Sequence, residues 1–513
     1  MRLRMWMYDL AREQCPTYEH LRQMAEMTER AGYNAWGIYL EHRFAYPSTP
    51  WAHGVGAVEP EVFQRLQKEF PNLQIIPFVN LLGHFEGMMY TEEGKQYREE
   101  LFTGLQACPA NPDFVALCKK LIDDVLATFN SELIHIGGDE TAQLGASEAS
   151  KSRIEALRLE NPEIEDGKAL LYGHHFGPLA DYVAAQGRRP AIWGDMLLEH
   201  PDAAKFLPKN TLIFDWQYFQ GLQDSTLKLQ ALGFEIVGSP AIQTYNATWC
   251  HLDESEKNVR EVAKDVVTMG LDGVCITTWE CGLFGSYDTI LPALEFCGKI
   301  LASPDTEGTI FDAYEAVSPA HRKWAEMMSR DLGALGGTFT PGRIRSSLKT
   351  RLLLMGNPFL AWLHHGEEFS GEHGDKVIEH LNHTLQVSPG EAESGITLFA
   401  RGAVEFIQMA EMSRLAYARG RVEEAIAALS PTRKLFDDLA NVAKRTHTRI
   451  GGSLADVERC KTARRHVEIV MQRLREFGDG SLGYLPAYEH ITNHKFMPHD
   501  QAAWWLINKW ANQ

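Results

Sequence analysis

Short apolar runs alternate with longer amphipathic segments along the first three hundred residues of the chain. The short runs have the length and composition of buried strands, and in the longer segments apolar side chains recur at the spacing of a helix. This alternation favours an α/β domain with parallel strands. The predicted strands cover residues 3–8, 34–40, 73–80, 133–136, 191–194, 211–216, 234–239 and 273–279.

Several of the predicted helices carry recognisable end signals. Thr17 can cap a helix that ends at Gly32, and Asn111-Pro112 can open a second helix. Asp253 can begin a third. Strands and helices therefore follow one another in regular order, and eight such units over this length predict a (β/α)8 TIM barrel.

Polar and aromatic side chains follow the predicted strands at their C-terminal ends, where a barrel of this kind carries its active site. Tryptophan faces can stack on a sugar ring while its hydroxyls meet carboxylates and arginine, so this rim predicts a sugar-binding site. In strand order the side chains are Asp9 and Arg12; Glu41, His42 and Arg43; Asn80, His84 and Glu86; Asp139 and Glu140; Trp193 and Asp195; Asp215, Trp216 and Tyr218; Tyr245 and Trp249; and Trp279 and Glu280.

The strand signals stop after about residue 310, and helical patterns take over. We therefore expect two domains, a catalytic barrel at 1–310 and an α-helical domain at 311–513. The helical domain is expected to support the barrel or to form the contact of a homodimer, since no residue in it carries evident chemistry. Its predicted helices cover residues 346–355, 375–385, 394–418, 422–429, 432–443, 454–476 and 501–510.

Composition narrows the range of partners. A chain of 513 residues with a net charge of −18 lacks the basic surface that a nucleic-acid phosphate backbone would need. The eight cysteines are scattered without a CxxC pair, so we expect neither a disulfide framework nor a zinc site. No stretch approaches the length that would span a membrane, and the N-terminus does not resemble a signal peptide. We expect a cytoplasmic protein that needs no cofactor.

The most informative stretch is Leu133-Ile134-His135-Ile136-Gly137-Gly138-Asp139-Glu140. It begins as a buried strand and ends in two adjacent acids. On a regular strand these two side chains would point to opposite faces, but the glycines allow a bend that brings them together. Because neighbouring carboxylates cannot both ionise freely, we expect the charge of Asp139 to raise the pKa of Glu140. An anion beside a protonated acid is suited to cleaving a glycosidic bond.

The segment His135–Glu140 resembles the H-x-G-G-D-E signature of glycoside hydrolase family 20, the β-N-acetylhexosaminidases. Other segments of residues 1–310 resemble the same family in the same order. They are Asp9-Leu10-Ala11-Arg12, Gly83-His84, Trp193-Gly194-Asp195-Met196, Asp215-Trp216-Gln217-Tyr218, Ser239-Pro240-Ala241 followed by Tyr245, and Thr278-Trp279. The chain is similar to the branch that lacks an N-terminal accessory domain and has a helical C-terminal domain.

The resemblance implies an exo-acting enzyme that removes terminal β-linked N-acetylhexosamine from an oligosaccharide or glycoconjugate by substrate-assisted catalysis. Glu140 would then be the general acid, and Asp139 would stay anionic and hold the N–H of the acetamido group. Tyr245, or failing that Tyr218, would contact the acetamido carbonyl. The resemblance assigns the remaining residues as follows: Trp193, Trp216 and Trp279 wall the sugar, Arg12 binds distant hydroxyls, and His84, His135 and Asp195 support the residues that touch the substrate.

Two departures from the family pattern concern the outer hydroxyls. Glu280 is the available substitute for an acidic residue that usually follows the last tryptophan, and the segment 41–43 differs from the expected one. The choice between GlcNAc and GalNAc therefore stays open.

Three alternatives remain beside this reading. The first is a sugar-binding protein without activity on the same barrel. The second is a retaining glycosidase whose nucleophile is Asp195 or Glu280. The third is a diguanylate cyclase, whose signature overlaps Gly137–Glu140; it is disfavoured because Thr141 replaces the expected phenylalanine and no nucleotide-binding context surrounds it.

Overall fold

The computed structural model describes residues 1–12, 14–101, 105–243, 249–279, 287–332, 357–359, 362, 366, 369–450, 455–485 and 488. The chain divides into two compact units. One unit comprises residues 1–242, 255–279 and 293–309, and the other comprises 243–254, 280–292 and 310–513. The chain passes from the barrel unit to the helical unit for the last time between residues 309 and 310, next to the expected boundary. Two earlier segments, 243–254 and 280–292, also group with the helical unit.

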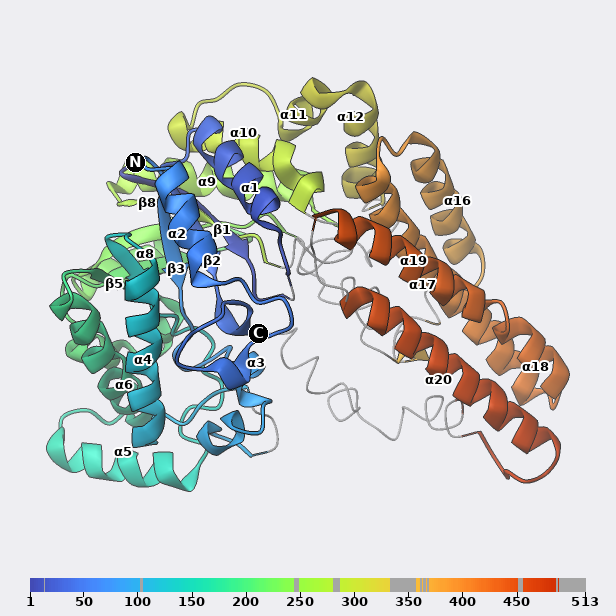
Figure 1. The fold of residues 1–513 in the computed structure, drawn as a ribbon, viewed down its shortest axis with the longest axis horizontal. Coiled ribbons are helices and arrows are strands. Elements are labelled where there is room, and N and C mark those ends of the chain that lie inside the picture. The colour runs from blue at the N-terminus through green and yellow to red at the C-terminus, as the bar shows by residue number, and fades with distance from the viewer. Residues whose placement is uncertain are drawn as a thin grey trace. The chain divides into compact units, whose positions relative to one another are not determined.

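The first unit is a closed barrel of parallel strands in sequential order, as the alternation of the sequence predicts. Helices surround it, and α2, α4 and α6 are seen on its outer face in Figure 1. The pairing of β1 with β8 closes the barrel, with Leu3 opposite Gly273. The strands are β1 (Leu3–Asp9), β2 (Ala35–Tyr39), β3 (Gln74–Phe78), β4 (Leu133–His135), β5 (Arg189–Trp193), β6 (Leu212–Trp216), β7 (Glu235–Ser239) and β8 (Gly273–Ile276).

Strand β8 ends three residues before the predicted limit at Trp279. Beyond Ile276 the only pairing described is an isolated bridge between Ala241 and Thr277. The ladder with β7 stops here because Pro240 has no N–H to donate. Trp279 therefore stands on a loop at the rim and not on a strand.

The helices of the barrel unit begin where the sequence signals place them. The Thr17 side chain accepts the His20 N–H at the start of α1, and the Asn111 side chain accepts the N–H groups of Asp113 and Phe114 at the start of α4. The described helices are α1 (Tyr18–Arg30), α2 (Pro60–Glu69), α3 (Glu86–Met89), α4 (Pro112–Thr128), α5 (Glu148–Glu160), α6 (Gly167–Ala185), α7 (Asp195–Glu199), α8 (Gln223–Ala231), α9 (Leu252–Met269) and α10 (Leu291–Ala302).

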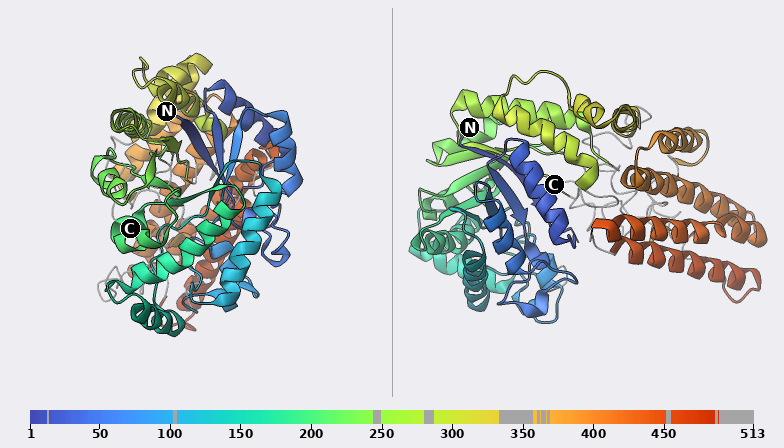
Figure 2. Two further views of the ribbon diagram at one scale, coloured as in Figure 1. Left: turned by 90° about the vertical axis from the view of Figure 1, so that its left-hand side faces the viewer. Right: turned by 45° about the horizontal axis from the view of Figure 1, so that its top comes forward.

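The second unit is helical in the part that the structure describes. Its long helices α17, α19 and α20 pack along one another, as the orange to red helices of Figure 2 show in the right-hand view. Residues such as Phe399, Phe406 and Phe436 form its buried core. The helices are α11 (Ile310–Val317), α12 (Pro319–Glu326), α16 (Glu372–Val387), α17 (Glu391–Ala418), α18 (Val422–Leu429), α19 (Thr432–Ile450) and α20 (Ala455–Gly478). The predicted helices at 346–355 and 501–510 lie outside the described residues.

Trp249 belongs to this helical unit and not to the barrel rim where the sequence pattern placed it. Its ring lies 4.5 Å from that of Trp324, and its indole N–H donates to the Thr289 hydroxyl. Residues 243–254 group with the helical unit, and the barrel unit resumes at Ser255 within α9.

Two general properties of the described residues bear on the environment of the protein. No helix among them combines the length and the hydropathy needed to cross a membrane. The seven cysteines in the described part are unpaired, and six of them are buried.

The glycine at the closing seam of the barrel gives a test of this fold. A Cβ at Gly273 would lie 2.0 Å from the Leu3 carbonyl oxygen, and the paired backbones cannot separate without opening the barrel. Gly273→Ala is therefore expected to lower the free energy of unfolding by about 2–3 kcal/mol. Denaturant unfolding measures the change. Gly483→Ala is the control, because a Cβ at Gly483 meets no atom within 4 Å; equal stability losses in both variants would contradict the predicted seam.

Candidate active site

The chain turns sharply after β4, and the turn carries both predicted catalytic acids. Gly137, Gly138 and Glu140 have φ angles of +78°, +102° and +45°, in the left-handed region that favours glycine. The Gly137 N–H donates to the His135 imidazole, and the Glu140 N–H donates to Asp195. This bend brings the adjacent carboxylates of Asp139 and Glu140 to one side, as the sequence predicted.

Neighbouring residues press on this turn so closely that two positions tolerate no side chain. A Cβ at Gly83 would lie 2.6 Å from the Asp139 carbonyl oxygen. A Cβ at Gly138 would lie 2.4 Å from the Tyr172 hydroxyl, which donates to the Gly138 carbonyl from α6. The glycines of the motif are thus explained by close packing as well as by backbone conformation.

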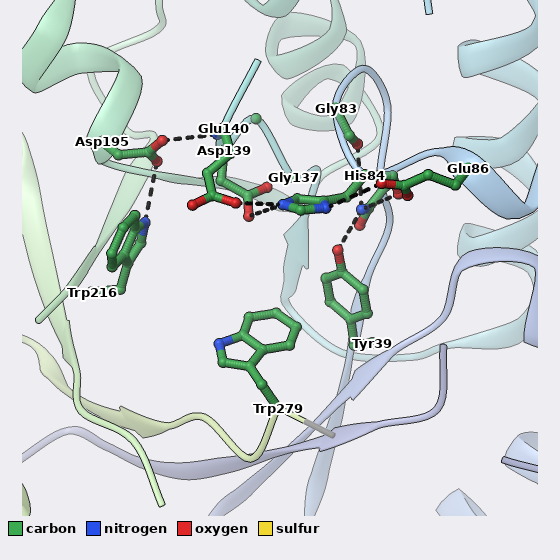
Figure 3. A network of polar contacts seen from close by, with 12 residues as sticks. Tyr39, Gly83, His84, Glu86, Gly137, Asp139, Glu140, Asp195, Trp216 and Trp279 are labelled. Atoms are coloured by element: carbon green, nitrogen blue, oxygen red, sulfur yellow. Dashed lines mark hydrogen bonds and ion pairs between the residues drawn. The ribbon is translucent and has the colours of Figure 1, made fainter. Parts of the chain in front are cut away.

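The imidazole of His84 lies between three carboxylates (Figure 3). Its Nε2 is 2.9 Å from Glu140 Oε2 and 3.7 Å from Asp139 Oδ2, and its Nδ1 is 3.6 Å from Glu86 Oε1. Asp139 is buried, whereas the Glu140 side chain is 34% exposed and is therefore the more accessible of the two acids.

The electrostatics of this cluster reverse the pKa order expected from the sequence. Burial opposes charge on His84, yet the three carboxylates outweigh it and raise the pKa of His84 well above its usual value. Burial likewise opposes charge on Glu140, but the hydrogen bond and the charge of His84 lower the pKa of Glu140. Burial raises the pKa of Asp139 to about 6 against the charge of His84. The expected rise for Glu140 is therefore wrong in this structure, because His84 acts on it more strongly than Asp139 does.

Asp195 holds the acid turn from the end of β5. One of its carboxylate oxygens accepts the Glu140 N–H at 2.9 Å, and the other accepts the Trp216 indole N–H at 3.3 Å. Burial and the charge of Asp139 raise the pKa of Asp195 to about 7. Asp195 thus connects the general-acid candidate to the aromatic wall.

The aromatic side chains at the end of β6 and on the segments after β6 and β8 meet at the rim. Tyr218 stacks on Trp216 with ring centroids 5.1 Å apart, and its hydroxyl accepts the Trp279 indole N–H at 2.8 Å. Trp216 and Trp279 are both partly exposed, which suits a wall that contacts a ligand.

Arg12 lies at the other side of the same wall. Its guanidinium carbon is 5.0 Å from the centre of the Trp279 ring and 5.3 Å from that of Tyr39, and it pairs with the buried Asp9 at 3.3 Å. These contacts fix the guanidinium at the rim, where the sequence predicted a hydroxyl-binding arginine.

Trp193 lies deeper than predicted for a residue that walls the sugar, and His135 lies beside it. Trp193 is 0% exposed and packs within the barrel core, 4.6 Å from the His135 ring and 6.1 Å from the Trp279 ring. The prediction that Trp193 forms part of the wall around the sugar is therefore wrong. Its ring packs against Trp279 from within the barrel core. His135 stacks on Phe78, and burial lowers the pKa of His135 well below its usual value, so a neutral imidazole accepts the Gly137 N–H.

Two other predicted site residues, Tyr245 and Glu280, lie outside the described residues.

The sequence missed Tyr39 as part of the site. It is the last residue of β2, within a run that looks uniformly apolar, and the only signal was a hydroxyl-bearing aromatic at a strand end. Asn80 and Glu86 were noted at the end of the third strand but were assigned no role. The structure places Asn80 against Tyr39 and the His84 carbonyl, and Glu86 against the His84 ring.

Backbone strain marks the same rim. Among the described residues, only Glu41, His84 and Glu140 combine a positive φ with a side chain, and they follow β2, β3 and β4. Such strain persists only where the surroundings enforce it, and it clusters at functional sites. No group of His, Cys, Asp and Glu in the described chain has the arrangement of a metal site. The chemistry that this cluster offers is proton transfer beside a buried carboxylate.

The comparisons with known proteins agree with this chemistry. Residues 74–270 match the family model "Glycosyl hydrolase family 20, catalytic domain". Human Hexosaminidase D is 24% identical over 416 residues, which cover 72% of this chain and 80% of the human protein.

Two solved structures are also similar, each with 17% identity and a TM-score of 0.48. The β-N-acetylhexosaminidase of Bacteroides fragilis matches over 64% of this chain and 71% of its own. The GH20 exo β-N-acetylglucosaminidase of Vibrio harveyi, solved in complex with N-acetylglucosamine, matches over 65% of this chain and 58% of its own.

The matched region includes β4 with its acid turn, the loop that carries His84, the start of α7 with Asp195, and the end of β6 with Trp216. On this agreement between family match and site, residues 74–270 resemble the catalytic domain of glycosyl hydrolase family 20, and the chain is a glycoside hydrolase.

Proposed function

We propose that the protein is an exo-acting β-N-acetylhexosaminidase that works by substrate-assisted catalysis. The family match and the relative named Hexosaminidase D support an amino-sugar substrate. The two adjacent acids at one turn support a mechanism in which the substrate supplies the nucleophile, because the third acid beside them, Asp195, accepts hydrogen bonds from the protein on both of its oxygens.

The observation that carries this proposal is the state of Asp139. Its Oδ1 is buried and has no hydrogen-bond partner among the described residues, whereas its Oδ2 faces His84 at 3.7 Å. A buried carboxylate oxygen without a donor is costly, and a ligand N–H relieves that cost. The acetamido N–H of an N-acetylhexosamine is such a donor, and glucose has none at that position.

The proposed reaction follows from these positions. The acetamido carbonyl oxygen attacks the anomeric carbon while Asp139 accepts the acetamido N–H and stabilises the positive charge that develops. As the glycosidic bond breaks, the proton shared between His84 and Glu140 passes through Glu140 to the leaving oxygen, which leaves Glu140 anionic and His84 neutral. Water then opens the oxazolinium ring with Glu140 acting as the base, which gives a product of retained configuration.

The remaining groups would bind the sugar. Trp216 and Trp279 would form the wall against its ring, and Arg12 would bind hydroxyls away from the scissile bond. Tyr245 is proposed to contact the acetamido carbonyl by resemblance alone. Tyr218 is the weaker candidate for that contact, because its hydroxyl already accepts the Trp279 indole N–H.

Asp195 is poorly suited to act as the nucleophile of a retaining glycosidase, which is the alternative mechanism. Both oxygens of that carboxylate accept hydrogen bonds from the protein, and the raised pKa of about 7 leaves it a poor anion for attack at neutral pH. The other candidate, Glu280, lies outside the described residues and is tested through the choice of substrate.

A substrate panel tests the proposal. We expect release of nitrophenol from the β-nitrophenyl glycosides of GlcNAc or GalNAc and none from that of glucose, because only the first two carry the acetamido group. The ratio of the two active rates measures the preference at the 4-position. Cleavage of the glucoside would favour an enzyme nucleophile, and no cleavage of any of the three would favour a sugar-binding protein.

Asp139→Asn removes the charge that the mechanism needs. This variant is expected to lower kcat by about two orders of magnitude or more while the unfolding midpoint stays within a few degrees of the wild type. Steady-state kinetics on the better amino-sugar substrate measure the loss. Wild-type kcat in a folded variant would rule out the role assigned to Asp139.

The pKa shifts predict the pH profile of kcat/KM. Asp139 must be anionic, so activity is expected to rise with pH through about 6, the value to which burial raises the pKa of this acid. His84 must keep its proton beside Glu140, and its raised pKa carries activity above neutral pH before it falls. Initial rates measured from pH 4 to 10 are expected to give a bell-shaped dependence of kcat/KM on pH.

The control for this profile is Glu140→Gln, which cannot transfer the proton. Its residual activity on a substrate with a very good leaving group is expected to keep the acid limb and to lose the alkaline one. A profile without an acid limb in the wild type would contradict an anionic Asp139.

A further inference from the structure

Tyr39 lies where the separate parts of the rim meet. It is 1% exposed at the end of β2, paired in register with Asp9 of β1 and Phe78 of β3. Figure 3 shows its hydroxyl directed towards the loop of His84, with the Trp279 ring beside it. A tyrosine at this depth must find a partner for its hydroxyl, and that partner determines what it does.

The partner is Asn80, and the orientation of its amide can be deduced. Asn80 Nδ2 lies 2.7 Å from the His84 carbonyl and 3.4 Å from the Gly83 carbonyl, both of which can only accept. The amide nitrogen must therefore face this loop, and so it also donates to the Tyr39 hydroxyl. One carboxamide thus connects Tyr39 to the backbone of His84.

This connection acts at a strained position. His84 has a φ of +48°, a conformation that a residue with a side chain adopts only when its surroundings hold it there. The imidazole that this turn presents lies 2.9 Å from Glu140. If the Asn80 amide turned away, the carbonyl of the strained residue would lose its donor.

The ring of Tyr39 has a second function, separate from that of the hydroxyl. It packs edge-to-face on Trp279 with centroids 4.8 Å apart, and the Arg12 guanidinium carbon lies 5.3 Å from its centre. Ring and hydroxyl can therefore be removed one at a time by substitution.

We propose that Tyr39 is a positioning residue that, through the Asn80 amide, holds the His84 turn against Glu140 and, through its ring, holds Arg12 against Trp279. The proposal rests on the proposed function for its kinetic consequences only. The charged groups that face His84 are Glu86 on α3 and Asp139 and Glu140 after β4. If the backbone turn at His84 shifts, the imidazole moves away from these carboxylates, and they stabilise its protonated form less.

The first measurement needs no substrate. The imidazole of His84, labelled with ¹³C at Cε1 and assigned by its absence in His84→Gln, is titrated by NMR in the wild type and in Tyr39→Phe. The loss of the hydroxyl is expected to lower the pKa of His84 by about half a unit or more, because the ring moves away from the carboxylates.

The second measurement separates the hydroxyl from the ring by kinetics. Two β-glycosides of the better amino-sugar substrate are compared, one with phenol and one with 2,4-dinitrophenol as the leaving group. In Tyr39→Phe, kcat is expected to fall about tenfold for the phenyl glycoside and to change less than about twofold for the 2,4-dinitrophenyl glycoside. The reason is that only phenol, the poor leaving group, needs a proton from the acid. KM should stay within about twofold of the wild type. Tyr39→Leu, which also removes the ring, is expected to raise KM about tenfold because Arg12 loses its aromatic support.

Tyr33→Phe is the matched control. Tyr33 is buried just before the start of β2 and donates to the Leu294 carbonyl, so the same atom and a real hydrogen bond are lost far from the rim. The control is expected to lower Tm without changing the His84 titration, KM or the dependence on the leaving group.

The results separate this proposal from the proposed function. An unchanged His84 titration in Tyr39→Phe, or the same change in Tyr33→Phe, would overturn the positioning role. A wild-type protein that cleaves no acetamido glycoside would overturn the proposed function, while the NMR titration would still decide whether Tyr39 holds His84.

Discussion

The site depends on one buried imidazole that is shared by three carboxylates. In the absence of His84, Asp139, Glu140 and Glu86 would place three negative charges close together in a largely buried space, and such an arrangement is unfavourable unless protons or cations neutralise it. With the imidazole protonated, the cluster carries one proton that His84 shares with the neighbouring carboxylates. The strained backbone at His84 and at Glu140 presents the imidazole and the carboxylate to each other.

The barrel distributes this task over almost all of its strands. Asp9 ends β1 and Arg12 follows it, Tyr39 ends β2, and Asn80 and His84 follow β3. Arg12 contacts the Tyr39 ring, Tyr39 contacts Asn80, and His84 contacts Glu140. The contacts continue from Glu140 through Asp195 and Trp216 to Tyr218 and Trp279, which returns to Arg12. The polar and aromatic contacts around the rim therefore form a closed circuit, which is possible because the sheet itself is closed.

Sequence patterns were sufficient for the strands, their order and the acid turn, because these follow from local apolar runs and from glycines next to acids. They failed where burial or distance in the chain decides the outcome. Trp193 and Trp216 look alike at strand ends, but the first lies within the core and the second at the rim. The pKa order of Asp139 and Glu140 depends on His84, which is 56 residues away in sequence from Glu140. Tyr39 was missed because nothing nearby in the sequence indicates its partner Asn80.

The contact of Gly83 with the Asp139 carbonyl also constrains how the site can move. Because not even a methyl group fits between the two segments, the loop after β3 and the turn after β4 have no space in which to slide past each other. A displacement of one must carry the other with it. The carboxylates of Asp139 and Glu140 and the imidazole of His84 therefore behave as parts of a single rigid piece.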